Sequence, residues 1–403
     1  MNAIQALTVF LVVFAIGELV ADKTKAVLST TLVIAFVLLM GFWFKWPDGS
    51  FFLPHELFDL SNVGPLAGIL ILVLITSMGT VIDLEELKRQ WKTVVVALAT
   101  LLIATVAIVF LDPYLFERDL AYAGAPIFAG ANVAVLILLN VFKNKVADPV
   151  LFQQLNSFIL LVLVFQNFVG IPISSFLLRI EAKRFIRHPE EMAVYLKDEA
   201  EKVALGPAKR KLLQFPDSFN KPTVILAKLG IVACIAQYLA GWTGGVVHPF
   251  VMCLLVGVAF TELGFLEKQS LSKSGSATFI MFATTMVIFA NLTKTTPELL
   301  MSLLYPLAVL LGTGAVFVII SGIIIGKIIG MSPLLAIPVG LTCTFGFPTT
   351  LFISQEVAAA IGTTPDEKKA IENYILPKML TGGFITVTIA SVLIAGFVGS
   401  HLF

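Results

Sequence analysis

Long apolar runs separated by short polar stretches fill most of this chain. A helix needs roughly 20 apolar residues to cross the hydrocarbon core of a bilayer, and runs of about that length recur in both halves. We predict membrane spans near 3–21, 26–45, 64–82, 93–111 and 150–178, and again near 223–242, 246–264, 274–292, 300–328 and 368–398. The pattern therefore predicts an all-α, polytopic membrane protein.

Two further apolar segments, 119–145 and 331–361, do not fit a single uninterrupted span. Small or helix-breaking residues interrupt the first around 130–132 and the second around 342–350. Irregular backbone is tolerated inside a bilayer only where it is buried in protein or lines a cavity. We therefore predict that each segment forms two half-helices, a re-entrant hairpin whose tip lies inside the membrane.

The same order of elements occurs twice: four spans, one broken segment and one long span. If both broken segments are re-entrant, each half crosses the membrane five times, and the odd number inverts one half relative to the other. We predict two inverted repeats, 1–180 and 222–403, each with five transmembrane helices plus one re-entrant hairpin, joined by a linker at 181–221. Interrupted segments at matching places in two halves indicate a transporter binding site.

The distribution of Lys and Arg gives an orientation. Most of them fall in loops that this topology places on one side, above all in the linker, and positive loops favour the cytoplasmic side. We expect a multi-pass protein of a bacterial inner membrane with both termini outside and the linker in the cytoplasm. Lys143 and Lys145 fit worst, and they favour a first broken segment that crosses fully. Both topologies stay open.

Composition narrows the function class. Only 13% of the 403 residues are charged and 58% are hydrophobic, whereas soluble domains carry about 25% charged residues. The net charge of +1 gives no reason to expect a nucleic-acid partner. The chain has no HExxH, GxSxG or phosphate-binding loop motif, so we expect no enzyme activity and no organic cofactor.

Candidate binding residues lie at the two tips and on the long span after each tip. The N-termini of half-helices suit anionic groups, and the carbonyls at their C-terminal ends suit Na⁺ or H⁺ carriers. Lys378 lies deep in an apolar span, where a charge is costly, and we expect it to bind a substrate carboxylate or replace a coupling cation. The alternative is a structural pair or snorkelling of the side chain toward the membrane surface, and Glu356 is a candidate partner. The predicted site is Gly130, Ala131, Asn132, Gln166, Asn167, Thr342, Thr344, Gly346, Thr349, Thr350, Lys378 and Thr381, with Na⁺ near the tips as the candidate metal ion.

Three stretches resemble the bacterial sodium/glutamate symporter family and, more distantly, the 2-hydroxycarboxylate transporters. They are SMGTVIDLEELKRQWKTVV, the pair APIFAGANVAVLILLNVFKNK and FQNFVGIPISSFLLR, and CTFGFPTTLFISQ. The resemblance implies sodium-coupled uptake of a small carboxylate by a homodimer with an elevator-like movement. The first tip departs from the family's Gly-Gly-His-Gly-Thr-Gly pattern, since residues 128–132 contain one glycine and no histidine. The resemblance therefore specifies neither the solute nor the coupling ion.

We expect an ion-coupled secondary transporter of a small polar organic solute, an amino acid or a carboxylate, that works by alternating access around the two tips. A cation/proton antiporter is the first alternative, but it normally needs a membrane-embedded Asp or Glu, and the Asp residues here fall in predicted loops. A membrane protein without transport activity is the second. It would leave the two matched broken segments without an explanation.

Overall fold

The computed structural model describes residues 1–24, 30–45, 51–81, 88–192, 195, 221–243, 247, 249–346 and 349–401. In these ranges the chain forms helices and no strand. Six of the described helical segments are long and apolar enough to cross a membrane: Ala3–Val20, Trp91–Tyr114, Pro149–Ile186, Pro222–Trp242, Pro297–Ile329 and Pro365–His401. The predicted class, a helical multi-pass membrane protein, is confirmed at this level.

Each predicted span contains a helix. The first half holds α1 (Ala3–Lys23), α2 (Thr30–Trp43), α3 (Leu57–Ser61), α4 (Val63–Gly79), α6 (Trp91–Leu111), the 3₁₀ turn η1 (Asp112–Tyr114), α7 (Arg118–Lys145) and α8 (Pro149–Ile186). The second half holds α10 (Pro222–Trp242), α11 (Pro249–Leu263), α12 (Ser270–Lys273), α13 (Ala277–Phe289), η3 (Ala290–Lys294), α14 (Pro297–Ile329), α15 (Pro333–Phe345), α16 (Thr349–Ile361), α17 (Pro365–Ile385), the π-helical turn η4 (Thr386–Ala390) and α18 (Ser391–His401).

The first broken segment is one continuous helix, so the prediction of two half-helices there was wrong. α7 has 28 residues and keeps Pro126 inside it; at 1.5 Å per residue it is about 42 Å long. Packing explains the difference: α7 lies along α8 and α18, and the Ser391 hydroxyl donates to the Gly130 carbonyl at 3.1 Å. Tertiary contacts of this kind override local helix breakers. The length of α7 agrees with the alternative of a fully crossing segment.

The second broken segment is interrupted as predicted. α15 ends at Phe345 and α16 begins at Thr349, while residues 347–348, including Pro348, lie outside the described part. The long span before the linker also differs from its prediction. α8 continues through Ile186, so residues 179–186, assigned to the end of the span and the start of the linker, are helical.

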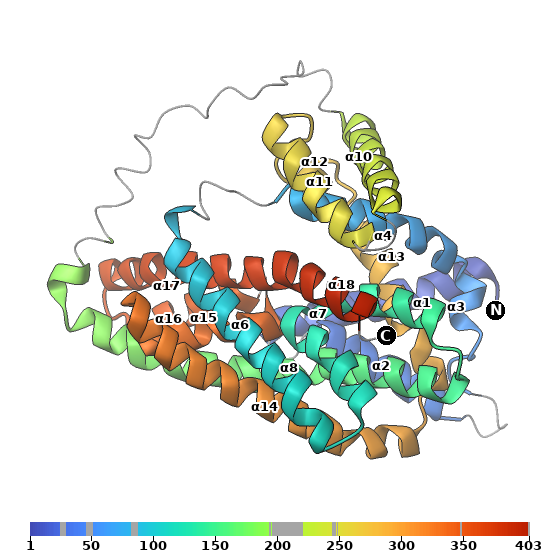
Figure 1. Ribbon diagram of the computed structural model, residues 1–403, viewed down its shortest axis with the longest axis horizontal. Coiled ribbons are helices and arrows are strands. Elements are labelled where there is room, and N and C mark those ends of the chain that lie inside the picture. The colour runs from blue at the N-terminus through green and yellow to red at the C-terminus, as the bar shows by residue number, and fades with distance from the viewer. Residues whose placement is uncertain are drawn as a thin grey trace.

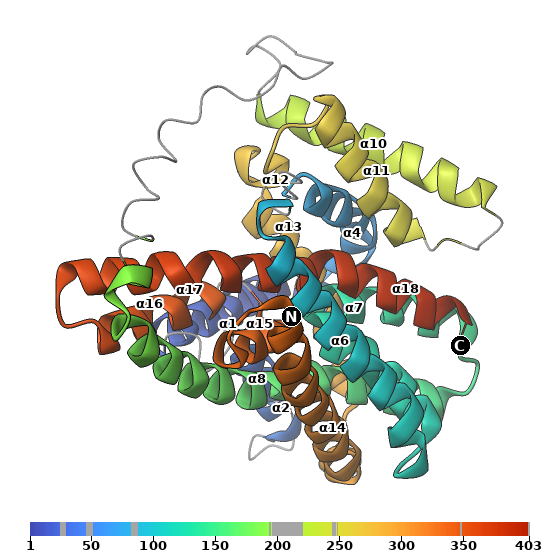
Figure 2. The same ribbon diagram turned by 60° about the vertical axis from the view of Figure 1, so that its left-hand side comes forward.

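The helices form two groups. α4, α10, α11 and α13 pack on one another as a peripheral bundle, and α6, α7, α8 and α14–α18 form a core bundle. Figures 1 and 2 show α10, α11 and α4 lying to one side of the long red helix pair α17 and α18. α1 and α2 pack together, and Phe14 of α1 meets Phe282 of α13 with ring centroids 4.7 Å apart.

The two halves of the chain interleave within the core bundle. The most extensive contacts there are α6 on α14, α7 on α18 and α8 on α15. In the order of elements, α6 corresponds to α14, α7 to α15 with α16, and α8 to α17 with α18. If each helix is replaced by its counterpart in the other half, the α7–α18 contact becomes the α15–α8 contact. The α6–α14 contact stays the same, because these two helices are each other's counterparts. The three most extensive contacts of the core bundle therefore each join a helix of the first half to a helix of the second, and the inverted repeats stay a prediction.

In the peripheral bundle, α4 and α11 cross with their backbones in contact. A Cβ added at Gly79 would lie 2.5 Å from the Val258 nitrogen and 2.8 Å from the Leu254 carbonyl oxygen. These are backbone atoms, which cannot move aside as a flexible side chain can. Small residues of this kind are what allow close helix packing inside a bilayer.

We expect Gly79→Ala to lower the stability of the protein by about 1–3 kcal/mol, the usual cost of overpacking a tight contact. Gly68 lies on the same helix, and a Cβ there would meet nothing within 4 Å, so Gly68→Ala is the matched control. The measurement is the thermal unfolding midpoint of both variants in one detergent. Equal midpoints for the two would show that α4 and α11 do not cross at Gly79.

Candidate functional site

The break between α15 and α16 is the most irregular backbone in the core bundle. Gly346 there has φ of 55° and ψ of −160°, a region that is open essentially to glycine alone. A Cβ at this residue would also lie 2.8 Å from Cγ2 of Val387. The carbonyl end of α15 and the amide end of α16 both terminate here, which brings partial charges of opposite sign to one place.

Long helices from both halves of the chain close around this break. On α8, Gly170 leaves room for Thr344, because a Cβ at Gly170 would overlap the Thr344 hydroxyl. On α17, a Cβ at Gly383 would lie 2.9 Å from Cγ2 of Thr350 and 3.6 Å from Cα of Gly346. α8, α15, α16 and α17 therefore meet at this break.

Three buried side-chain oxygens in this part of the bundle make no hydrogen bond with any described residue. They are Oε1 of Gln166 and Oγ of Ser174 on α8, and Oγ1 of Thr350 on α16. Gln166 and Ser174 stand four residues before and after Gly170, and residues four apart share a helix face. Leaving such groups unpaired in an apolar interior is unfavourable. These oxygens are the strongest candidates in the site for holding a polar solute or a cation.

Other predicted residues of the second tip serve the helix itself. The hydroxyls of Thr342 and Thr344 donate to the carbonyls of Val339 and Leu341 at 2.6 and 2.7 Å. Hydroxyls in membrane helices often bond their own backbone in this way. The remaining predicted members, Asn167, Thr349 and Thr381, are buried.

The residues predicted at the first tip lie on the continuous α7, yet they come near the break. Gly130 contacts Ser391 at the start of α18, whereas Gly346 approaches Val387. Val387 and Ser391 are four residues apart across the π turn η4, so the two segments meet neighbouring positions of one helix. Asn132 is half-buried and its Oδ1 has no hydrogen-bond partner among the described residues. The side chain of Ala131 lies outside the described part.

The ammonium group of Lys378 lies among aromatic side chains. Its Nζ donates to the Tyr374 carbonyl, one turn earlier on α17, at 2.7 Å, and lies 4.4 Å from the centre of the Tyr374 ring and 4.9 Å from that of Tyr195. Its expected partner Glu356 forms an ion pair with Arg179 instead, at 3.0 Å. The transport role of Lys378 stays a prediction, and its contacts match the structural alternative.

Near Lys378 lies a buried carboxylate that the sequence analysis assigned to the linker. Glu181 on α8 has no exposed surface. It accepts hydrogen bonds from the Tyr374 hydroxyl at 2.8 Å, from Arg184 at 2.9 Å and from the Ser332 hydroxyl at 2.7 Å. Full pairing makes a buried charge tolerable, and the cluster fastens the end of α8 to α17 and to the residue before α15.

The other buried carboxylate that sequence reasoning missed is Asp112, which follows α6 directly and has no exposed surface. It was assigned to a loop because the apolar run ends at residue 111. Among the described residues, no group of three or more His, Cys, Asp or Glu side chains could hold a metal ion. The predicted Na⁺ site near the tips stays a prediction.

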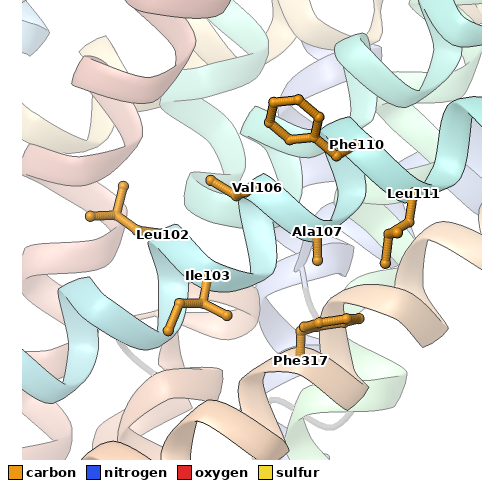
Figure 3. Close-up of a pocket in the computed structure, with 7 residues that line it drawn as sticks. All are labelled: Leu102, Ile103, Val106, Ala107, Phe110, Leu111 and Phe317. Carbon is orange, nitrogen blue, oxygen red and sulfur yellow. The ribbon is translucent and has the colours of Figure 1, made fainter.

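An open apolar groove of about 460 Å³ lies elsewhere, between α6 and α14 (Figure 3). It is lined only by Leu102, Ile103, Val106, Ala107, Phe110, Leu111 and Phe317. A site for a polar solute needs a few well-placed polar groups in its wall. The groove has none, and its lining is suited to lipid chains.

Comparison of the sequence with models of known protein families gives no match, and comparison with curated proteins gives none.

We expect Tyr374→Phe to destabilise the protein by about 1–3 kcal/mol, because it removes one hydrogen-bond donor from the buried carboxylate of Glu181. Tyr305→Phe on α14 is the control, since Tyr305 is 60% exposed. Thermal unfolding of the two variants in the same detergent makes the comparison. A midpoint for Tyr374→Phe no lower than that of the control would mean that the cluster does not stabilise the fold.

Proposed function

We propose that this protein is an ion-coupled secondary transporter of a small polar organic solute, an amino acid or a carboxylate, and that the solute binds at the break between α15 and α16. The observation that carries the proposal is the combination at that break. A helix is interrupted where long helices from both halves surround it, and buried oxygens of Gln166, Ser174 and Thr350 have no hydrogen-bond partner in the part of the chain that the structure describes. Unwound helix ends are where transporters bind their solutes and ions.

The division into two bundles supports alternating access. Helices of the core bundle pack far more extensively on one another than on the peripheral bundle, which they meet mainly through α7 with α13 and α11 with α18. We propose that the core bundle moves as a unit against the peripheral one, as the elevator-like movement expected from the family resemblance requires. The pattern of the core contacts supports internal repeats, and their inverted orientation stays a prediction.

The test is a thermal-unfolding screen of the purified protein against amino acids, amines and carboxylates, each with and without Na⁺. A ligand that binds the native state raises its stability by mass action, by about 2.7 kcal/mol at a concentration one hundred times Kd. We expect one carboxylate or amino acid to raise the midpoint only in the presence of Na⁺ or at a particular pH. A shift with Na⁺ or with pH alone, and none with any organic solute, would instead favour the cation/proton antiporter.

A pair of variants locates the ligand found by that screen. Thr350→Val removes a buried hydroxyl at the break, and we expect it to abolish or strongly reduce the ligand-induced shift. Thr8→Val removes an exposed hydroxyl on α1 and should leave the shift unchanged. An undiminished shift in Thr350→Val would place the ligand somewhere other than the break.

A further inference from the structure

Asp112 is the one carboxylate among the described buried residues that the protein leaves without any hydrogen bond. Its side chain has no exposed surface, and both carboxylate oxygens lack hydrogen-bond partners. Glu181, equally buried, has three donors. An ionised carboxylate in an apolar interior is strongly unfavourable unless it is paired.

Several backbone amides close to the Asp112 carboxylate are absent or already bonded. An Asp at the start of a helical turn usually accepts from amides two or three residues later. Here the next residue is Pro113, which has no N–H, and the amides of Leu115 and Phe116 are taken by the carbonyl of Asp112 itself, at 2.8 and 3.0 Å. The carboxylate therefore depends on what the neighbouring helices offer.

Those helices are α6, α7 and α14. The hydroxyl of Thr313, in the middle of α14, is the polar group that faces Asp112, although the two do not reach hydrogen-bond geometry. Arg118 on α7 is engaged with Tyr122, at 2.8 Å from its Nε to the phenol oxygen. No ion pair joins Asp112 to any described charged or titratable residue of these three helices. Those residues are Lys92, Arg118, Asp119, Tyr122, Lys143, Lys145, Glu298, Tyr305 and Lys327.

We propose that Asp112 is a proton-binding site of this protein and carries the coupling proton of its transport cycle. A metal cation would need several oxygen ligands around it, and among the described residues no group of three or more His, Cys, Asp or Glu side chains could hold one. A proton needs a single oxygen: it adds to the carboxylate, forms a neutral carboxyl group and leaves no charge to be solvated. The buried arrangement seen here is then the protonated state of the carrier.

The position of Asp112 links it to the solute site. α6 and α14 hold Asp112 and also pack against α15, while α7 reaches from η1 to Gly130 beside η4. Loss of the proton would leave a charge that this packing cannot accommodate, so the deprotonated protein is expected to favour an arrangement that exposes Asp112 to water. When the protonated and the deprotonated protein favour different conformations, proton binding is coupled to the alternating-access movement. This coupling rests on the proposed function; the proton site itself does not.

Infrared difference spectroscopy of the full-length protein in lipid, between acid and alkaline pH, tests the site without any solute. A neutral carboxyl group has a C=O stretching band that a carboxylate lacks. We expect a band that appears and disappears reversibly with pH in the wild type, is lost in Asp112→Asn and is kept in Asp59→Asn, which changes an exposed carboxylate on α3. A band unchanged in Asp112→Asn, or a band of Asp112 that no pH removes, would overturn the proposal.

Thr313→Val provides a second test if Asp112→Asn does not fold. Removing the facing hydroxyl changes the polar surroundings of the buried carboxyl group, so its C=O band should change in frequency. An unchanged band would assign it to another carboxyl group and overturn the proposal. If the band titrates as expected but no solute shifts the unfolding midpoint, the proton site stands and the transport function falls.

Discussion

Helices in a bilayer cannot be held together by the removal of apolar surface from water, because lipid chains are as apolar as the side chains that face them. Close backbone contact and hydrogen bonding must hold such helices together instead. In this protein the close contacts depend on glycines, which have no side chain to keep two helices apart. Gly79 brings α4 onto α11 in the peripheral bundle, and Gly170 brings α15 onto α8 at the candidate site. The same contact that packs the core therefore also places the broken helix.

The sequence predicted most of the helices because hydrophobic length is a strong signal in a membrane protein. It was less reliable where small residues interrupt an apolar run. The interruption at Gly346 breaks the helix, whereas the one around Gly130 does not, although both segments contain an internal proline. The difference lies in φ and in the neighbours: Gly346 adopts a conformation that only glycine tolerates, and Gly130 remains helical with its carbonyl held by Ser391. Neither feature can be deduced from residue type alone.

Polar positions show the same limit. Gln166 and Thr350 were predicted for the site, and both are buried, as an amide and a hydroxyl in apolar helices often are. Lys378 was predicted for the site because of its charge. Its long side chain reaches one helical turn back, and its ammonium group contacts the Tyr374 carbonyl and the rings of Tyr374 and Tyr195. Asp112 was overlooked because it stands one residue beyond an apolar run, and only packing shows that it is enclosed.

The π turn η4 has a consequence for how α17 and α18 divide their contacts. A π turn holds one residue more than an α turn, and one residue corresponds to about 100° of rotation about a helix axis. Because of this extra residue, α18 is rotated about its axis relative to α17. Val387 faces Gly346 while Ser391 faces Gly130. If the turn relaxed to α geometry, α18 would swing by that angle and release α7 while α17 kept its hold on α15 and α16. A single residue of register thus determines how one long helix is divided between two contacts.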